Sequence, residues 1–337
     1  MKDVFKNKII LVTGGCGSIG SEIVRQLLKF EPKQIRVFDN RETESFNMQH
    51  ELREHENLSF LMGDVRDKER LNLAMDKVDI VFHAAALKHV PSCEYNPFEA
   101  VKTNVYGTQN AIECALENEV EKFINISTDK VTNTINTMGA TKLLAERLVN
   151  AAEFYKGYRK TIFSSVRFGN VVGSNGSVIN LFKEQIKSRG LITLTNPEMT
   201  RFIMSIPQAV KLVLETAKEM NGGETFILKM PVFKLEDLAN ICIDVFSGNK
   251  KIAVKNIGLR PGEKMYENLM TEEEAKNAFE TETSFIVLSE IIPSNYKSEE
   301  NKQKRLKKTA LRNYCSKEIE PLSKEKLKML LIKEKII

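Results

Sequence analysis

Residues 8–20 read KIILVTGGCGSIG, an apolar run that ends in a cluster of glycines. The run has the length and continuous apolarity of a strand buried on both faces of a parallel sheet. From Ser21 to Phe30 apolar residues recur at helical spacing, so the glycines occupy the turn between a strand and a helix. This order predicts the first strand–turn–helix unit of an α/β fold.

The same alternation continues for some 150 residues, which favours a Rossmann-type doubly wound parallel sheet. Further strands are expected at 34–38, 58–62, 79–83, 123–127 and 163–168, and a further helix at 141–154. We expect a nucleotide-binding Rossmann domain over 1–170, joined by some later segments. A smaller substrate-binding lobe would follow, mainly over 171–295, and a basic helical tail over 296–337.

The composition is that of an ordinary globular chain, with 42% hydrophobic and 28% charged residues among 337. No apolar run approaches the roughly 20 residues that span a bilayer, and the N-terminus lacks the apolar stretch of a signal peptide. We therefore expect a cytoplasmic protein without membrane insertion. The five cysteines show no C-x-x-C spacing, which predicts reduced thiols and no metal site.

The net charge of +5 is unevenly distributed. Residues 301–337 hold twelve Lys and Arg against four Asp and Glu, or +8, which leaves −3 for residues 1–300. A basic tail could contact nucleic acid or an anionic membrane. Its leucines, at helical spacing and without interleaved aromatic residues for base stacking, favour a solvated helix and no nucleic-acid partner. They are Leu322, Leu327, Leu330 and Leu331.

The glycine cluster has the spacing of a dinucleotide-binding turn. Gly14 and Gly17 permit a tight turn and close approach of a pyrophosphate to backbone N–H groups, and Gly20 allows the helix to pack on the strand. The alternative is that the glycines only form the turn. Their place between a strand and a helix favours a dinucleotide site.

Two residues after the second strand bear on the choice of dinucleotide. Asp39 lies 19 residues after Gly20, where a carboxylate binds the adenosine ribose diol and repels a 2′-phosphate. Arg41 could instead pair with that phosphate, so NAD is favoured and NADP stays open. Asp64, after the third strand, would face the adenine amino group. The predicted cofactor-binding residues are Gly14, Gly17, Ser18, Ile19, Gly20, Asp39, Arg41, Asp64, Val65, Ala84, Ala85, Ala86 and Lys142.

Residues 127–130 read STDK and residues 138–142 read MGATK. Lys142 falls one helical turn after Met138, so both side chains share a face. A lysine there can hold a nicotinamide ribose, and Ser127 can bind a substrate hydroxyl. Alternatively Lys142 is a surface lysine, Asp129 caps a turn and Lys130 is only its ion-pair partner.

These motifs resemble a known family. Thr128-Asp129-Lys130 with Asn136, together with AAALKHVP at 84–91, looks like the inverting UDP-N-acetylglucosamine 4,6-dehydratases of pseudaminic-acid and capsule biosynthesis, which are extended short-chain dehydrogenases/reductases. The similarity covers roughly residues 5 to 275, including RFGNVVGS at 167–174, MTRF at 199–202 and GLRPGEK at 258–264. The superfamily normally carries a catalytic Tyr at the position of Met138. Capsule-type members often carry Met there, so this departure shifts the subfamily rather than the reaction class.

The resemblance implies a reaction in which the sugar C4 is oxidised by hydride transfer, the C5 proton and C6 hydroxyl are lost, and the hydride returns to C6. Lys130 would be the C5 base, its pKa lowered by burial and by Lys142. Asp129 would stay protonated and donate to the C6 oxygen, and Asp129 or a water would take the C4 hydroxyl proton. The implied catalytic residues are Ser127, Thr128, Asp129, Lys130, Met138 and Lys142.

For the substrate UDP-N-acetylglucosamine, the Arg260 fork suits the diphosphate and Glu263 could accept the uridine ribose hydroxyls. Asn170, Arg201 and Lys88 are further candidates, and Arg260 with Glu263 could instead form a surface ion pair. A homo-oligomer, dimer or hexamer, is expected from the resemblance. Two other interpretations stay open: a nucleotide-sugar 4-epimerase, against which the Asp129-Lys130 pair argues, and a non-catalytic NAD(P)-binding protein.

Overall fold

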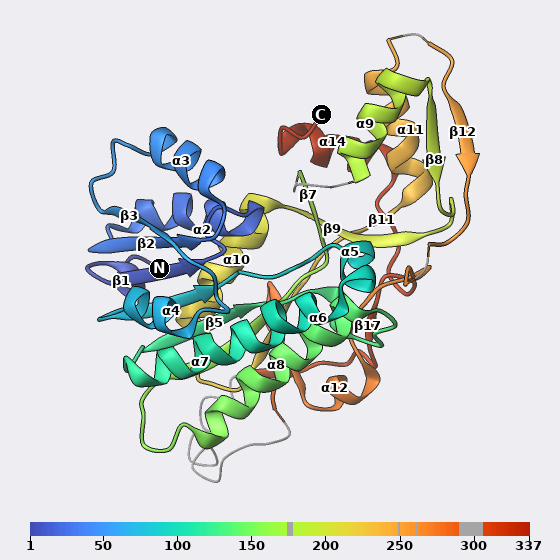
Figure 1. Cartoon of the computed structure of the whole chain (residues 1–337). Coiled ribbons are helices and arrows are strands. Elements are labelled where there is room, and N and C mark those ends of the chain that lie inside the picture. The colour runs from blue at the N-terminus through green and yellow to red at the C-terminus, as the bar shows by residue number, and fades with distance from the viewer. Residues whose placement is uncertain (174–177, 249, 261, 290–305) are drawn as a thin grey trace.

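The computed structural model describes residues 1–173, 178–248, 250–260, 262–289 and 306–337. Figure 1 shows a sheet covered by helices, with a smaller group of helices and strands on one side of it. Across the described residues the chain folds as the α/β structure that the sequence predicts.

The central element is a ten-stranded sheet in the order β16-β14-β15-β10-β6-β5-β4-β1-β2-β3. From β10 to the β3 edge of this order, each strand pairs in parallel with its neighbour. At the other edge, β15, β14 and β16 pair antiparallel. The bounds are β1 Ile9–Thr13, β2 Gln34–Asp39, β3 Leu58–Met62, β4 Ile80–His83, β5 Lys122–Ile126, β6 Ile162–Arg167, β10 Thr225–Leu228, β14 Ala278–Glu280, β15 Ser284–Val287 and β16 Lys307–Lys308. The five later strands expected from the sequence are thus confirmed to within a residue or two.

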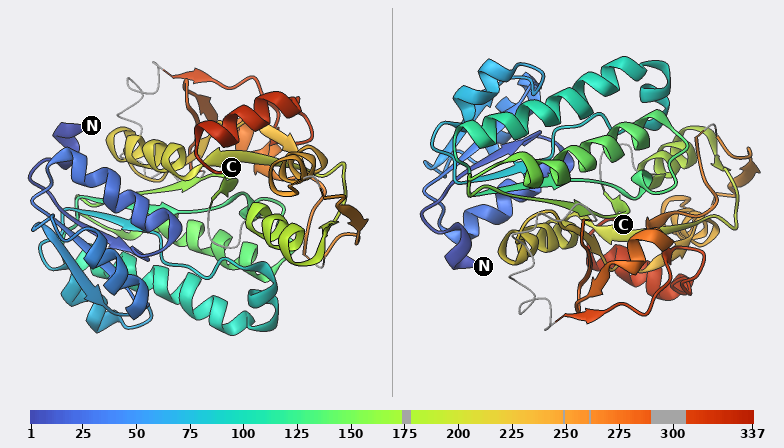
Figure 2. Two further views of the ribbon diagram at one scale, coloured as in Figure 1. Left: turned by 90° about the horizontal axis from the view of Figure 1, so that it is seen from above. Right: turned by 90° about the horizontal axis from the view of Figure 1, so that it is seen from below.

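Helices cover both faces of the sheet, which Figure 2 shows from two sides. On one face α2 packs against α10, and on the other α4, α7 and α8 lie side by side. Each face has its own apolar core, with Val24 and Val213 in one and Leu71 and Val149 in the other. The bounds are α1 Lys2–Phe5, α2 Ser18–Leu27, α3 Glu42–Glu51, α4 Lys68–Met75, α5 Val90–Tyr95, α6 Pro97–Ala100, η2 Val101–Tyr106, α7 Gly107–Glu117, α8 Thr137–Tyr155 and α10 Ile206–Glu219.

Helix α8 begins four residues before the sequence predicts, because Asn136 caps it. The Asn136 Oδ1 accepts a hydrogen bond of 2.7 Å from the Gly139 N–H. An N-cap side chain satisfies a backbone donor that otherwise lacks a partner in the first turn. This cap brings position 138 into the helix.

The smaller lobe has a third apolar core. It is built from α9 (Val178–Arg189), β8 (Leu191–Leu194), α11 (Leu235–Phe246) and α14 (Lys324–Lys333). The exposed strand β12 (Ala253–Asn256) pairs with β8. A three-stranded sheet of β7 (Asn170–Val172), β9 (Thr200–Ser205) and β11 (Val232–Lys234) adjoins it. Short pieces complete the fold: η1 Leu28–Phe30, η3 Asp129–Val131, α12 Glu272–Lys276, β13 Asn268–Met270 and β17 Tyr314–Cys315.

The domain boundaries stay a prediction. Strands β10, β14, β15 and β16 of the large sheet come from after residue 170. Of the expected tail, residues 296–305 lie outside the described part, and residues 307–308 join the large sheet as β16. The tail helix forms as α14, where Leu327 and Leu331 are fully buried.

Within the described residues, no helix is both long and apolar enough to cross a membrane. All five cysteines are free thiols. In the same part of the chain, no group of three His, Cys, Asp or Glu side chains is arranged to hold a metal ion.

The packing of α14 can be tested by substitution. Leu331→Ala should lower the free energy of unfolding by about 2–5 kcal/mol, because it removes a fully buried side chain from the lobe core. Chemical denaturation followed by circular dichroism measures the change. Met329→Ala, two residues away on the exposed side of the same helix, should change it by about 0.5 kcal/mol or less. Equal effects of the two substitutions would contradict this packing.

Candidate active site

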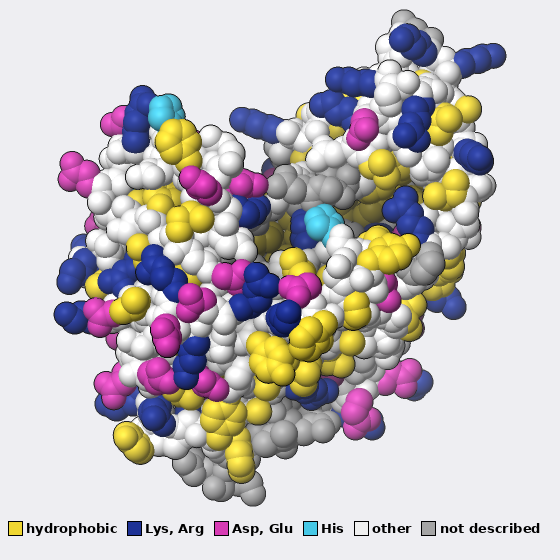
Figure 3. All heavy atoms as spheres, viewed as in Figure 1, with side chains coloured by type: hydrophobic (Ala, Val, Ile, Leu, Met, Phe, Trp, Pro, Cys, Tyr) yellow, Lys and Arg dark blue, Asp and Glu magenta, His cyan; other side chains and the backbone are white. Residues whose placement is uncertain are grey.

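A cleft of about 760 Å³ lies along the edge of the sheet where the parallel strands end. Figure 3 shows the molecule hollowed between the sheet and the smaller lobe. The carboxyl ends of parallel strands are where α/β sheets bind ligands. Four segments contribute most of the lining: the glycine turn, residues 84–89, residues 126–130 and residues 168–171.

The glycine turn packs too closely for larger residues. A Cβ on Gly14, whose φ is +63°, would lie 2.7 Å from the Ala85 Cα, and one on Gly20 would lie 2.2 Å from the Gly14 oxygen. The turn therefore lies directly against residues 84–85 and brings the N-terminus of α2 to the cleft. Exposed N–H groups at a helix N-terminus suit a phosphate, so these residues fit the pyrophosphate of a dinucleotide.

Asp39 and Arg41 form one ion pair at the end of β2. The Asp39 carboxylate, 5% exposed, accepts hydrogen bonds from the backbone N–H groups of Cys16 and Arg41, at 2.9 and 3.1 Å. It also accepts two from the Arg41 guanidinium, both at 3.1 Å. The hydrogen bond to Asp39 is the main cause of the raised pKa of Arg41. Asp39, which favours NAD, and Arg41, which could favour NADP, are thus bound to each other at the rim of the cleft.

Asp64 and Val65 also line the cleft, as the sequence predicts. Burial raises the pKa of the Asp64 carboxyl, but hydrogen bonds from Arg66 and Asn40 outweigh it, so the net shift is downward. Asp64 is therefore an ionised acceptor at the predicted adenine end.

The segment after β5 carries the acidic and basic pair. The Ser127 N–H donates to Val166 and the Asp129 N–H donates to Phe168, so the segment runs beside the end of β6. The Asp129 Oδ1 accepts hydrogen bonds from the Thr128 hydroxyl at 2.8 Å and from Lys130 Nζ at 2.9 Å. Two buried atoms at this edge, Ser127 Oγ and Asp129 Oδ2, have no hydrogen-bond partner among the described residues. Such groups are costly to leave unpaired, so they are available to a ligand.

Met138 and Lys142 both line the cleft from α8, as their spacing predicts. Met138 is 3% exposed and lies in a small apolar cluster with Cys93, Ala100 and Val90. Lys142 is buried, and its Nζ donates to the Ile126 carbonyl at 2.6 Å. The suggestion that Lys142 is a surface lysine is therefore wrong. Burial lowers the pKa of Lys142 to about 8, with Glu146 opposing the shift.

The expected lowering of the Lys130 pKa is wrong. Burial does lower it, but the charges of Asp129 and Glu267 and the hydrogen bond that Lys130 donates to Asp129 outweigh that effect, and the net shift is upward. Lys142, the neighbour named in the expectation, is not among the causes; Arg201 is the cation that opposes the shift. Glu267, whose Oε1 lies 3.8 Å from Lys130 Nζ, was not found from the sequence. It lies three residues beyond the 258–264 motif, and no spacing relates it to Lys130.

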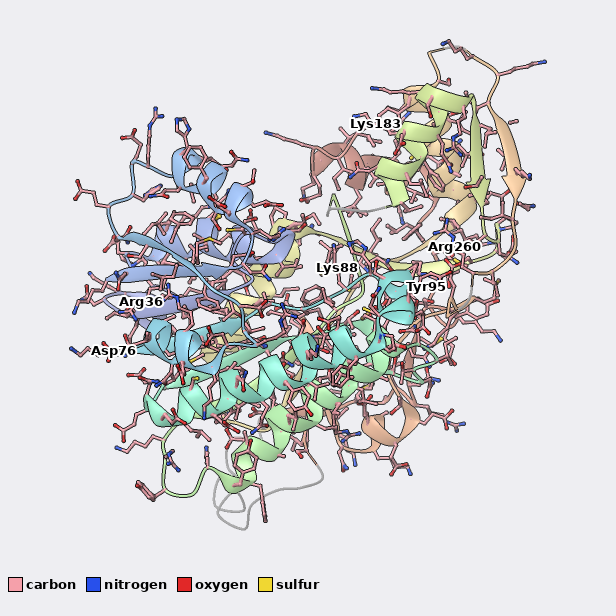
Figure 4. All side chains as sticks on the ribbon, in the orientation of Figure 1. Arg36, Asp76, Lys88, Tyr95, Lys183 and Arg260 are labelled. Carbon is pink, nitrogen blue, oxygen red and sulfur yellow. The ribbon has the colours of Figure 1, made fainter. Side chains whose placement is uncertain are left out.

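The predicted substrate residues fall into two groups. Lys88 and Asn170 line the cleft, and Figure 4 shows Lys88 between the sheet and the lobe. Arg201, Arg260 and Glu263 do not line it. The Arg201 guanidinium donates to the carbonyls of Thr200, Lys264 and Met265. Glu263 accepts a hydrogen bond from the Arg260 backbone N–H. Direct substrate contact by these three residues stays a prediction.

With this geometry established, the family can be identified. A family model described as polysaccharide biosynthesis protein matches residues 10–289. The chain belongs to this family. A UDP-N-acetylglucosamine 4,6-dehydratase (inverting) of Campylobacter jejuni is 41% identical over 286 residues, 84% of this chain and 84% of that protein. These findings confirm the predicted resemblance to extended short-chain dehydrogenase/reductase dehydratases.

Other relatives carry different names. An uncharacterized membrane protein of Methanocaldococcus jannaschii is 55% identical over 98% of this chain and 97% of its own length. A UDP-glucose 4-epimerase of Rickettsia rickettsii is 38% identical over 98% of this chain and 96% of its own length. The X-ray structure of Pen from Bacillus thuringiensis is similar with a TM-score of 0.92 and 44% identity, covering 99% of both chains. The family thus includes nucleotide-sugar dehydratases and epimerases, and the chain is an enzyme of this group.

The Asp39–Arg41 pair yields a test of cofactor choice. Asp39→Ala removes a carboxylate and releases the Arg41 guanidinium, so the affinity for NADP relative to NAD should rise by about tenfold or more, the worth of a hydrogen bond to a charged group. Calorimetric titration with each nucleotide measures the ratio. Glu44→Ala is the control, because Glu44 lies 3.8 Å from the same guanidinium without its hydrogen bonds. An unchanged ratio in Asp39→Ala would remove Asp39 from the site.

Proposed function

We propose that this enzyme is an inverting nucleotide-sugar 4,6-dehydratase. It converts UDP-N-acetylglucosamine to a UDP-4-keto-6-deoxy-N-acetylhexosamine with inversion at C5, for surface polysaccharide or glycan synthesis. The observation that carries the proposal is the Asp129–Lys130 pair, hydrogen-bonded at 2.9 Å on the wall of the cleft that Lys142 also lines. Hydride transfer alone does not need this pair, whereas removal of the C5 proton and the C6 hydroxyl does.

The proposed cofactor is NAD or NADP, with NAD favoured, bound tightly and recycled. When bound, it accepts the hydride from C4 and returns it to C6. The glycine turn would hold the pyrophosphate and Asp39 the adenosine ribose. Lys142, anchored on the Ile126 carbonyl, would hold the nicotinamide ribose hydroxyls. With a pKa of about 8 it is largely cationic at neutral pH, which keeps this part of the cleft positive.

The elimination follows from the unpaired atoms. Ser127 Oγ is available to the C4 hydroxyl and Asp129 Oδ2 to the C6 oxygen. The Lys130 ammonium first passes a proton to the Asp129 carboxylate, to which it donates at 2.9 Å. The neutral amine of Lys130 then takes the proton from C5, the C5–C6 double bond forms as the C6–O bond breaks, and Asp129 gives its proton to the departing hydroxyl, which leaves as water. Because the pKa of Lys130 is raised in the free protein, Lys130 must lose a proton before it acts. Met138 has no proton to exchange, so Asp129 or a water relays the C4 hydroxyl proton.

The assembly is part of the proposal. Large apolar side chains are exposed on α6, η2 and α8, where Figure 3 shows hydrophobic atoms gathered. They include Phe98, Tyr106, Leu144 and Phe154, each between 48% and 66% exposed. An exposed apolar patch of this kind marks an interaction surface, which supports a homo-oligomer.

A nucleotide-sugar 4-epimerase is the second candidate, favoured by the Rickettsia relative. It would return the hydride to C4 and leave the C6 hydroxyl in place. Incubation of the purified protein with UDP-N-acetylglucosamine separates the two. A 4-keto-6-deoxy product that absorbs in alkali supports the dehydratase, whereas UDP-N-acetylgalactosamine would show an epimerase.

Lys130 is the residue on which the elimination depends. Lys130→Ala should slow dehydration by about 10²–10⁴ or more, the usual contribution of a general base. Cofactor affinity should not change, because Lys130 is assigned to C5. The rate at which the C5 proton exchanges with solvent deuterium measures the action of the base directly. If Lys130→Ala exchanges this proton at the wild-type rate, Lys130 is only a structural partner of Asp129.

Met138 tests the proton route at C4. Met138→Ala should keep the dehydration rate within about tenfold of wild type, while the lost packing against Cys93 and Ala100 lowers the free energy of unfolding by about 2–5 kcal/mol. Steady-state rates and chemical denaturation measure the two effects. A rate loss of several orders of magnitude in folded, cofactor-bound protein would show that Met138 positions the sugar directly.

A further inference from the structure

Glu267 lies in a charge cluster with Lys130 and Arg201, and the reaction outlined above gives it no role. Its Oε1 is 3.8 Å from Lys130 Nζ and 3.7 Å from Arg201 Nε. The residue is 4% exposed, and its Oε2 has no hydrogen-bond partner among the described residues. Lys130 therefore lies between two carboxylates, Asp129 at 2.9 Å and Glu267.

The backbone of Glu267 is held rigidly. Its N–H donates to Ser316 Oγ at 3.0 Å, and its carbonyl accepts from the Ser316 N–H at 2.9 Å. On the opposite side the Thr132 hydroxyl donates to the carbonyl of Asn268, the next residue. Glu267 thus reaches Lys130 from a segment docked onto the loop that carries Lys130, and the backbone that bears its carboxylate is held without help from Asp129.

We propose that Glu267 is a positioning residue that sets the charge state of Lys130, and hence the pH at which Lys130 becomes a base. This role rests on the proposed function of Lys130. It goes beyond the Asp129–Lys130 pair, because a second buried carboxylate, 137 residues away in the sequence, controls the same amine.

The surrounding charges give the direction of the effect. Four charged groups act on Lys130: Asp129 and Glu267 favour its ammonium form, whereas the cations Arg201 and Lys264 oppose it. Burial raises the pKa of Glu267, and Asp129 adds to the shift, whereas Lys130, Arg201 and Lys264 oppose it. Without Glu267, burial and the two cations would act on Lys130 against Asp129 alone. The pKa of Lys130 should then fall, and the neutral amine should be populated at lower pH.

A titration of the full chain in the absence of substrate tests this role. The protein is labelled with ¹³C at lysine Cε, and Lys130 is assigned as the signal missing from Lys130→Arg. In the wild type its midpoint should lie above the ordinary 10.5. In Glu267→Gln it should lie about 1–3 pH units lower, the usual effect of one opposite charge at this distance.

Two variants serve as controls. Glu267→Asp keeps the charge and should keep the midpoint within about one unit of wild type. Glu272→Gln removes the same charge from the exposed first turn of α12 and should leave the midpoint unchanged. Equal midpoints in wild type and Glu267→Gln would overturn the proposal. A wild-type midpoint below 10.5 would overturn it without any variant, so the test does not depend on how well Glu267→Gln folds.

A kinetic experiment then links the titration to the reaction. The rate of C5 deuterium exchange should rise with pH as Lys130 loses its proton, and in Glu267→Gln this rise should move to lower pH by the same interval. If the exchange rate of Glu267→Gln rises at the same pH as that of the wild type, the link to Lys130 is contradicted. The titration needs no turnover, so an absence of dehydratase activity would refute the proposed function and leave the charge-setting role of Glu267 to be judged by the NMR result alone.

Discussion

The central parallel strands are buried on both faces, and this constraint determines where the chemistry can lie. Strands β1, β4, β5, β6 and β10 show almost no exposed residue, so most of their residues are apolar, and the charged ones, Lys122 and Arg167, stand at strand ends. Charged side chains therefore gather where the strands end. Since parallel strands end at the same edge, segments far apart in the sequence meet there and form one cleft.

Burial acts on the two lysines of this edge in opposite net directions because their neighbours differ. Lys142 has a carbonyl within hydrogen-bond distance and only Glu146 to favour its charge, so its pKa falls to about 8. Lys130 faces two carboxylates, and its pKa rises. The same desolvation thus leaves one lysine poised near neutral pH and the other firmly protonated. The difference is a property of the fold, since it comes from residues brought together from distant segments.

The sequence predicted those features that depend on neighbours along the chain. The strands followed from apolar runs, the glycine turn from its place between a strand and a helix, and the shared face of Met138 and Lys142 from helical spacing. Asp39 and Arg41 were both placed at the rim, but their mutual ion pair was not foreseen, because two roles toward a cofactor were weighed separately. Each of these inferences needed only local geometry.

Features that depend on tertiary contacts were missed. Glu267 contacts Lys130 across more than a hundred residues, so no spacing revealed it, and the direction of the Lys130 pKa shift was wrong for that reason. The buried network in which Arg167 joins Glu146 and Glu274 was also unforeseen. Likewise, the basic residues near the C-terminus suggested a tail, whereas Leu327 and Leu331 pack α14 into the lobe core.

The central claim is that this cleft removes the C5 proton and the C6 hydroxyl of a nucleotide sugar. Proton NMR of the product formed from UDP-N-acetylglucosamine in deuterated water tests it most directly. The account predicts a 4-keto-6-deoxy sugar with deuterium at C5, inverted configuration at that carbon and a new methyl signal from C6. A product that retains the C6 hydroxyl and a protonated C5 would contradict it.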